Sequence, residues 1–245
     1  MNTVQLLKRK FKEINSKGYI KSINNNKNSS GLTLEYQLES TGGDFNIPDF
    51  YDIEIKAIRQ YKFADITLFN SGPDGKYVTP TQWLSENFGY PDKDYKNTKV
   101  FKGDVYANKN NPIGRFFTYK LKVDRNQKRI ILLIYNSYGK LLNSDLYWDF
   151  DSLEEKITRK LKKIAIFEFS KKIVDNVYYY KYTTCNIYRY TNFERFLKCV
   201  ENGIIYVTFN TGVNKSGPYI GKFSDHGTAF RVSKNNICKM FDRFT

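Results

Sequence analysis

The stretch PDFYDIEIKAIR, residues 48–59, decides the fold and the chemistry of this chain. Apolar and polar residues alternate along it, and this period of two is typical of a β-strand, whose successive side chains point to opposite faces. We therefore expect a strand over 52–58 that turns one face to the core and carries a Glu and a Lys on the other. The core face would hold Ile53, Ile55 and Ala57.

The polar face carries Glu54 and Lys56, and Asp49 precedes them in the pattern Asp-x4-Glu-x-Lys. At alternate positions of one strand, Glu54 and Lys56 would be separated by roughly 7 Å along the backbone. Two carboxylates can offer oxygen ligands to Mg²⁺, and a lysine beside them can orient a water molecule and stabilise developing negative charge. Glu35 is a third candidate carboxylate if its segment packs across this strand. A bare Glu-x-Lys also occurs on ordinary exposed strands, so the spacing alone leaves both interpretations open.

The charge balance favours a polyanionic partner. The chain has 245 residues, with 40 Lys and Arg against 25 Asp and Glu, for a net charge of +15. Such an excess attracts nucleic acid, although a coding bias toward Lys, Asn and Ile would produce much of it too. The length allows one large domain or two lobes.

Cysteine usage and hydropathy indicate a cytoplasmic protein. The three cysteines, Cys185, Cys199 and Cys238, are widely spaced without a Cys-x-x-Cys pair, so neither a zinc site nor a disulfide framework is indicated. The longest apolar run, 130–135, is too short to cross a membrane. The first residues lack the uninterrupted apolar core of a signal peptide and instead show the spacing of an amphipathic helix over 3–16.

Further along the chain, helical and strand patterns are mixed, which predicts the α/β (α+β) class, a mixed sheet flanked by helices. After 3–16, the helices expected from apolar spacing are a short one capped by Ser29 or Ser30, then 153–164, 193–200 and a closing helix at 235–244. After 52–58, the expected strands are 66–69 beside it, 116–123, 129–135, 167–173, 177–190 and 204–209.

Residues 18–59 resemble the catalytic region of a known enzyme family. The matching features are a Gly-aromatic-Ile-Lys-Ser opening at 18–22, a Gly-containing loop, Thr-Leu-Glu-x-x-Leu at 33–38, and Asp-x4-Glu-x-Lys starting fourteen residues after Glu35. Weaker matches are Leu-Phe at 68–69 and Asp-His-Gly-Thr-Ala-Phe-Arg at 225–231. Together they resemble the monomeric type II restriction endonucleases of the MvaI/BcnI family, which is related to the mismatch-repair nicking endonuclease MutH.

The resemblance implies a PD-(D/E)XK restriction-endonuclease-like fold shaped as a two-lobed clamp around double-stranded DNA. Asp49 and Glu54 would be metal ligands with the Ile55 main-chain carbonyl, Lys56 would serve the attacking water, and Glu35 would complete the catalytic set. Family members act as monomers, nicking one strand and then the other to leave 5′-phosphate ends. We expect residues 1–115 to form mainly the catalytic lobe and 116–245 mainly the recognition lobe with a C-terminal DNA-contacting segment. The boundary is soft, and the two lobes can interleave along the chain.

DNA contacts are expected from two segments. Lys21, Asn24 and Lys27 lie in a polar loop that either touches the phosphate backbone or is simply solvated. His226, the only histidine, and Arg231 lie in the matching C-terminal segment, where an arginine can bind the guanine edge in the major groove. The diverged middle of the chain leaves the recognition sequence open.

Three functions remain to be separated. The first is a prokaryotic, cytoplasmic type II restriction endonuclease that uses Mg²⁺, for which Mn²⁺ would substitute while Ca²⁺ binds without supporting cleavage. Its cognate DNA methyltransferase is expected as a genetic companion rather than as part of a stable complex. The second is a MutH-like repair enzyme that nicks a single strand, and the third is a non-catalytic DNA-binding protein whose acidic residues are structural.

Overall fold

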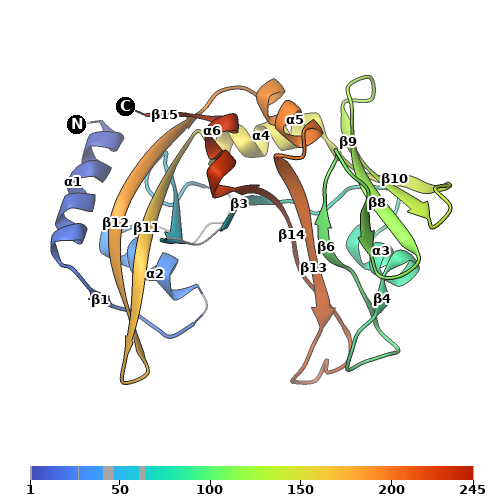
Figure 1. The fold of residues 1–245 in the computed structure, drawn as a ribbon, viewed down its shortest axis with the longest axis horizontal. Helices are drawn as coiled ribbons and strands as arrows, with labels where there is room; N and C mark the ends of the chain where they lie inside the picture. The colour runs from blue at the N-terminus through green and yellow to red at the C-terminus, as the bar shows by residue number, and fades with distance from the viewer. Residues whose placement is uncertain (1, 27, 41–46, 61–63, 245) are drawn as a thin grey trace. The chain divides into compact units, whose positions relative to one another are not determined.

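Contacts divide the chain into two compact units in the computed structural model, which describes residues 2–26, 28–40, 47–60 and 64–244 (Figure 1). Unit 1 comprises Met1–Ile66, Glu155–Thr191 and Ser233–Thr245, and unit 2 comprises Thr67–Glu154 and Asn192–Val232. These ranges differ from the expected boundary at residue 115. Two segments from the second half of the chain, 155–191 and 233–245, contribute strands to the sheet of unit 1, which begins in the first half.

Unit 1 is built on a sheet with strand order β1-β12-β11-β2, to which β15 adds along β12. The strand β2 runs parallel to β11, whereas β12 is antiparallel to β11, β1 and β15. The strands are β1 (Ile20–Lys21), β2 (Glu54–Arg59), β11 (Lys163–Val174), β12 (Val177–Tyr190) and β15 (Phe241–Arg243).

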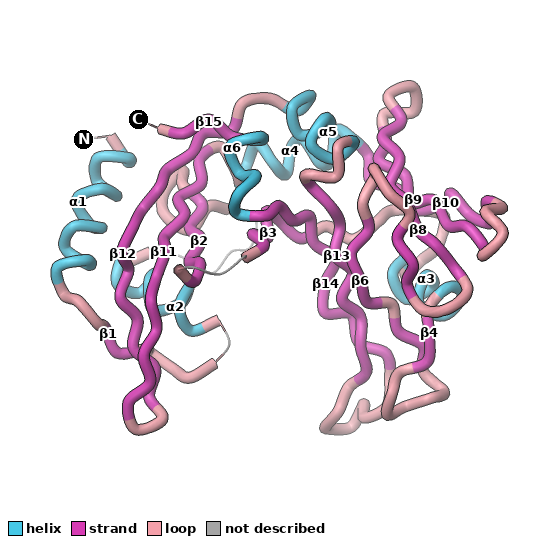
Figure 2. The backbone as a smooth tube through the Cα atoms, viewed as in Figure 1, coloured by secondary structure: helices cyan, strands magenta, loops and turns pink. Residues whose placement is uncertain are grey.

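Two helices complete the core of unit 1, α1 (Thr3–Ser16) and α2 (Ser29–Leu38), which lie along this sheet (Figure 2). Leu7 of α1 and Leu34 of α2 are fully buried in one cluster with Ile55 and Phe167. Because strand side chains alternate between faces, the burial of Ile55 on this side places Glu54 and Lys56 on the opposite face, as the sequence predicts.

Unit 2 contains two four-stranded sheets, in the orders β10-β9-β8-β7 and β3-β14-β13-β6, and a short β4-β5 pair. The first sheet consists of β7 (Asn111–Ile113), β8 (Phe117–Asp124), β9 (Arg129–Asn136) and β10 (Leu141–Asp149). The second consists of β3 (Asp65–Asn70), β6 (Lys102–Val105), β13 (Ile205–Val213) and β14 (Phe223–Ser233), while the pair is β4 (Tyr90–Pro91) and β5 (Lys99–Val100). The helices are α3 (Pro80–Phe88), α5 (Phe193–Glu201) and the first part of α4 (Phe150–Lys160).

An aromatic cluster forms the core of unit 2. Phe69 stacks on Phe230 with ring centroids 4.9 Å apart, and Trp148 meets Phe230 edge-on at 5.5 Å. The indole N–H of Trp148 donates to the Ser71 carbonyl at 3.0 Å, which satisfies its polar atom inside the core. These aromatic contacts stabilise the packing of β14 against β3 and against Trp148 of β10.

Most of the expected elements are confirmed, and four differ. The strand at 65–70 belongs to the sheet of β14, so β11 rather than β3 is the neighbour of β2. The helix expected to reach residue 164 ends at Lys160, because Ile164 already pairs with Glu54 in the sheet. The closing helix is reduced to η1 (Lys234–Asn236) and α6 (Ile237–Met240), since β12 offers an open edge that the next residues occupy as β15. The helix cap expected at Ser29 or Ser30 falls instead on Asn28.

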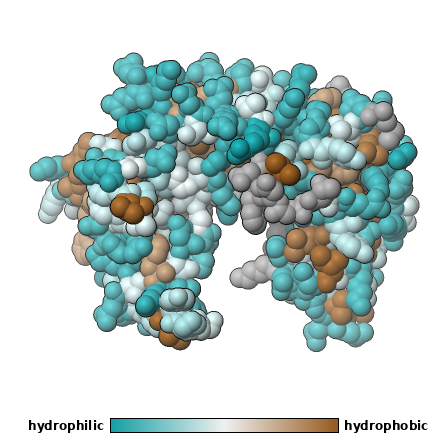
Figure 3. All heavy atoms as spheres, turned by 180° about the vertical axis from the view of Figure 1, so that it is seen from behind, coloured by the Kyte–Doolittle hydropathy of each residue, from teal (hydrophilic) through white to brown (hydrophobic). Residues whose placement is uncertain are grey.

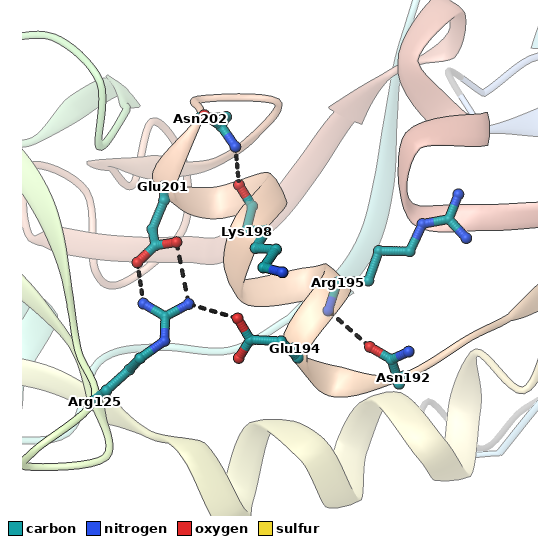
Figure 4. A network of polar contacts seen from close by, with 7 residues as sticks. All are labelled: Arg125, Asn192, Glu194, Arg195, Lys198, Glu201 and Asn202. Carbon is teal, nitrogen blue, oxygen red and sulfur yellow. Dashed lines mark hydrogen bonds and ion pairs between the residues drawn. The ribbon is translucent and has the colours of Figure 1, made fainter.

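An exposed ion cluster joins the end of β8 to α5 in unit 2 (Figure 4). The guanidinium of Arg125 donates to Glu194 at 2.8 Å and also contacts Glu201. All three side chains are at least 36% exposed, so water screens the attraction.

We expect Arg125→Met to lower the free energy of unfolding by about 1 kcal/mol or less. Chemical denaturation of both proteins would measure it, with Phe196→Ala in the buried face of α5 as a contrast that should cost about 3–5 kcal/mol.

No helix in the described ranges is long and apolar enough to span a bilayer. Hydrophobic residues form small, separate spots on the mostly hydrophilic face seen in Figure 3.

Candidate active site

A tight turn brings Asp49 beside β2. Phe50 and Ile53 exchange backbone hydrogen bonds of 3.0 and 2.9 Å, with Tyr51 in a left-handed conformation at φ +55° between them. The chain therefore reverses over two residues, and the Ile55 N–H donates to Asp49 Oδ2 at 2.9 Å. The spacing of four residues between Asp49 and Glu54 is the spacing that this turn requires.

The Ile55 carbonyl shares this edge of the sheet. In an extended strand the N–H and C=O of one residue point to the same side. Because the Ile55 N–H bonds to the Asp49 carboxylate rather than to β11, its carbonyl also points toward Asp49. A main-chain oxygen and the Asp49 carboxylate thus lie together.

Glu54 is a buried carboxylate held by two lysines. It is 1% exposed, and its Oε1 lies 2.5 Å from Lys56 Nζ and 3.4 Å from Lys160 Nζ. Burial is the main cause that raises the pKa of Glu54; Lys56 opposes the shift and Asp49 adds to it. Its Oε2 is buried without a hydrogen-bond partner among the described residues.

Glu35 reaches the same cluster from α2. Hydroxyl contacts fix the start of this helix on β12: Ser29 Oγ lies 2.6 Å from Tyr180 Oη, and Tyr182 donates to the Ser30 carbonyl at 2.6 Å. Burial raises the pKa of Glu35, Asp49 raises it further and Lys56 partly offsets this. The structure therefore brings together all four residues predicted as the catalytic set, and they all belong to unit 1.

The chemistry of this cluster suits a divalent cation. Within the described ranges no group of three or more His, Cys, Asp or Glu side chains is gathered closely enough to form a complete metal site. However, Glu54 Oε2 is a buried oxygen that has no hydrogen-bond partner in the described part of the chain, and the Asp49 carboxylate lies beside the Ile55 carbonyl. Hard cations such as Mg²⁺ keep several waters and need only one or two carboxylates from the protein, so this donor set fits one.

Residues 21–26 of the polar loop lie beside the start of β12 and the turn that precedes it. Asn25 donates to the Asn176 carbonyl at 2.9 Å and accepts from the Tyr178 N–H at 3.3 Å. Lys21 pairs in register with Tyr179 and is exposed, whereas Asn24 Oδ1 accepts from the Asn26 N–H within its own turn. Lys27 lies outside the described residues.

His226 and Arg231 lie on β14 in unit 2, a strand that the sequence did not predict. His226 borders a pocket of about 300 Å³ that is lined also by Lys93, Lys102 and Lys215. Gly212 leaves room for the His226 ring, since a Cβ there would stand 2.6 Å from Nε2. Arg231 Nε is buried with no hydrogen-bond partner among the described residues. Sequence reasoning missed Lys160, which lies inside the helix expected over 153–164 and carries no local signal that it meets Glu54.

Comparison with known proteins agrees with this geometry. The sequence matches the MvaI/BcnI restriction endonuclease family over residues 8–241, while no curated protein matches the chain. One similar solved structure is the complex of restriction endonuclease MvaI with its cognate DNA substrate, with a TM-score of 0.87 and 27% identity over 100% of this chain and 98% of that one. Another is MvaI in the absence of DNA, with a TM-score of 0.63 and 26% identity over 100% of this chain and 97% of that one.

Fold, cluster and matches together define a type II restriction endonuclease, a site-specific deoxyribonuclease. The chain belongs to the MvaI/BcnI restriction endonuclease family. The resemblance drawn from residues 18–59 is therefore confirmed, and the family match favours an enzyme over the alternative of a non-catalytic DNA-binding protein. Enzymes of this class generally use divalent metal ions.

Proposed function

We propose that this protein is a Mg²⁺-dependent PD-(D/E)XK nuclease that cuts both strands of double-stranded DNA at a specific site. The observation that carries the proposal is the meeting of Glu35, Asp49, Glu54 and Lys56, from three segments, at one edge of a sheet. The similar MvaI structure contains cognate DNA, which supports double-stranded DNA as the substrate. The net charge of +15 supports binding of the phosphate backbone.

Each residue of the cluster has a role in this proposal. Asp49, Glu54 and the Ile55 carbonyl would hold the cation, which supplies positive charge to the phosphate and lowers the pKa of a bound water. Lys56 leaves Glu54 to orient the attacking water and to stabilise charge on the phosphate. Glu35, whose pKa is raised by burial and by the nearby Asp49, would accept a hydrogen bond from water bound at the cation. The products would carry 5′-phosphate ends.

A single catalytic cluster of this kind occurs in the described ranges, so a monomer can cut only one strand at a time. We therefore infer that it nicks one strand, then reorients and nicks the other. Cleavage of supercoiled plasmid tests this: open-circle DNA should appear first and linear DNA should follow at a rate independent of enzyme concentration above saturation. Persistent open-circle product without linear DNA would indicate a MutH-like nicking enzyme instead.

The metal preference follows from the oxygen donors. Mg²⁺ should support cleavage, Mn²⁺ should substitute, and Ca²⁺ should bind without supporting cleavage. An enzyme of this activity would cut the DNA of its own cell, so we infer a prokaryotic host with a cognate DNA methyltransferase that need not bind the enzyme.

Unit 1 would cut the DNA, and unit 2 would contribute to reading the site through His226 and Arg231. This assignment is supported by the basic pocket beside His226 and by Arg231 Nε, which is buried and has no hydrogen-bond partner among the residues that the structure describes. The exposure of Lys21 on the strand that borders the polar loop supports a contact with the DNA backbone, whereas the Asn24 side chain is engaged within its own turn.

Gly212→Ala is expected to weaken cognate DNA binding by displacing the His226 ring. The added methyl group would meet Nε2 at 2.6 Å, so the exposed imidazole must rotate away. If His226 contacts a base edge, loss of that contact should cost roughly tenfold in cognate affinity. His226→Ala should give a loss of similar size, measured by fluorescence anisotropy in Ca²⁺.

Gly72→Ala is the matched control, because its methyl group would meet only Thr81 Oγ1 at 3.8 Å, an ordinary contact. Non-cognate binding should be equal in all these variants. If the ratio of cognate to non-cognate affinity stays at the wild-type value in His226→Ala, His226 does not read the site.

A further inference from the structure

The turn that brings Asp49 beside β2 is strained. Tyr51 adopts the left-handed conformation, with φ +55°, which is unfavourable for a bulky side chain. Its ring packs edge-on against Phe50 at 5.0 Å, yet the residue is 69% exposed, so side-chain packing restrains it only weakly. A residue keeps such a conformation only where the surrounding structure imposes it, so this turn needs a restraint from outside.

Asp52, the other central residue of the turn, supplies that restraint. Its Oδ1 accepts a hydrogen bond from the Thr3 hydroxyl at 2.8 Å, and its Oδ2 lies 2.5 Å from Lys163 Nζ. Thr3 is the first residue of α1 and Lys163 the first of β11, so two regular elements bind the two carboxylate oxygens. The first turn of α1 has no acidic residue of its own, and a negative charge beside a helix N-terminus is favourable.

Asp52 also ties the turn to the strand next to β2. Lys163 is followed by Ile164, which pairs in register with Glu54 in the parallel β2–β11 pair. The turn and the strand that carries Glu54 are thus fixed to the same point of β11. The distance between the turn and Glu54 is therefore constrained from outside the catalytic cluster.

Asp49 lies just before this restrained turn. The Ser40 hydroxyl donates to the Asp49 carbonyl, and the Asp49 carboxylate accepts from the Ile55 N–H at 2.9 Å. Asp49 is therefore anchored on its N-terminal side by Ser40 and on its C-terminal side by the turn that Asp52 holds. A ligand that is held in position before the cation arrives binds it more tightly, because less ordering remains to be done on binding.

We propose that Asp52 is a positioning residue of the metal site, which holds the strained turn at Tyr51 and thereby presents the Asp49 carboxylate to the cation. This inference rests on the proposed function of Asp49. Both oxygens of Asp52 are bound by Thr3 and Lys163, so Asp52 acts through the turn and does not ligate the cation itself. The contribution of Asp52 to metal binding thus depends on the strain in the turn.

The test is Asp52→Ala, alone and combined with Tyr51→Gly. Titration calorimetry with Mn²⁺ in the absence of DNA should show roughly tenfold weaker binding for Asp52→Ala. The Mg²⁺ concentration for half-maximal single-turnover cleavage should rise by a similar factor, while the rate at saturating Mg²⁺ stays near wild type, because every ligand is still present. Glycine adopts the left-handed conformation without strain, so the double variant should bind Mn²⁺ within about threefold of Tyr51→Gly alone.

Asp149→Ala is the matched control. The Asp149 side chain is 42% exposed, against 38% for Asp52, and it pairs with Arg129 at 3.0 Å in unit 2. Its Mn²⁺ affinity and cleavage rate should equal those of the wild type. Thermal unfolding checks that each variant is folded. If Asp52→Ala is not, Asp52→Asn takes its place, because it keeps an acceptor for Thr3 and loses only the ion pair with Lys163.

The inference is overturned if Asp52→Ala matches Asp149→Ala in Mn²⁺ affinity. It is also overturned if Asp52→Ala weakens Mn²⁺ binding equally with Tyr51 and with Tyr51→Gly, which would mean that Asp52 acts through its charge. Failure of saturating Mg²⁺ to restore the cleavage rate would overturn it as well, since the cluster as a whole would then be disrupted.

Asp49→Asn separates this inference from the function on which it rests. Wild-type Mn²⁺ affinity and cleavage in Asp49→Asn would refute the proposed metal site itself. An inactive Asp49→Asn beside an Asp52→Ala that behaves as wild type would refute only the positioning role of Asp52.

Discussion

Lys56→Met is expected to abolish DNA cleavage, lowering the single-turnover rate by about 10³-fold or more. The ammonium of Lys56 lies 2.5 Å from Glu54 and is 24% exposed, so it stands at the boundary between the buried carboxylate and the solvent from which water and phosphate arrive. Methionine fills similar volume but can neither orient the water nor stabilise the phosphate charge. Cleavage of a plasmid or of a labelled duplex would measure the effect.

DNA binding should survive this change, because one positive charge out of a net charge of +15 is lost. Gel-shift or anisotropy measurements in Ca²⁺ should therefore give an affinity within a few-fold of wild type. The matched control is Lys10→Met, which removes a lysine with a 20% exposed side chain that contacts Glu39 in the same unit. Wild-type cleavage by Lys56→Met, or an equal loss in Lys10→Met, would contradict the assignment.

Glu54→Gln is expected to have an effect of similar size for a different reason. The substitution keeps the shape of the side chain but removes the negative charge, and a neutral amide is a poor ligand for a hard cation in competition with water. Mn²⁺ affinity should fall at least about tenfold and cleavage about 10³-fold, and high metal concentration should restore only part of the rate. Calorimetry and cleavage assays over a range of Mg²⁺ and Mn²⁺ concentrations would show both effects.

Glu39→Gln serves as the control for Glu54→Gln. Its side chain is 78% exposed and pairs with Lys10, so its removal should change neither metal affinity nor cleavage. Circular dichroism should confirm that Glu54→Gln is folded, because the change leaves Lys56 and Lys160 without their shared carboxylate. Unchanged Mn²⁺ affinity in Glu54→Gln would remove Glu54 from the set of metal ligands.

Local patterns predicted much of the fold because several elements carry their own signals. The amphipathic spacing over 3–16 predicted the helix α1, and the alternation around 116–135 predicted the strands β8 and β9. The pairing of strands was not predictable in the same way: β3 resembles a neighbour of β2 in sequence but pairs in the sheet of β14. The choice depends on aromatic contacts such as Phe69 with Phe230, which join residues far apart in the chain.

The sequence alone determined that Asp49, Glu54 and Lys56 form a local cluster of two carboxylates and a lysine, because one turn and one strand place them near each other whatever surrounds them. Only the tertiary structure decided how that chemistry is completed. It buried Glu54 to 1% exposure and placed Glu35 across the turn through contacts between α2 and β12. It also brought Lys160 from a helix more than a hundred residues away, because β11 must lie parallel to β2 for the sheet to close its core. Burial and long-range pairing depend on the whole fold, and no local spacing encodes them.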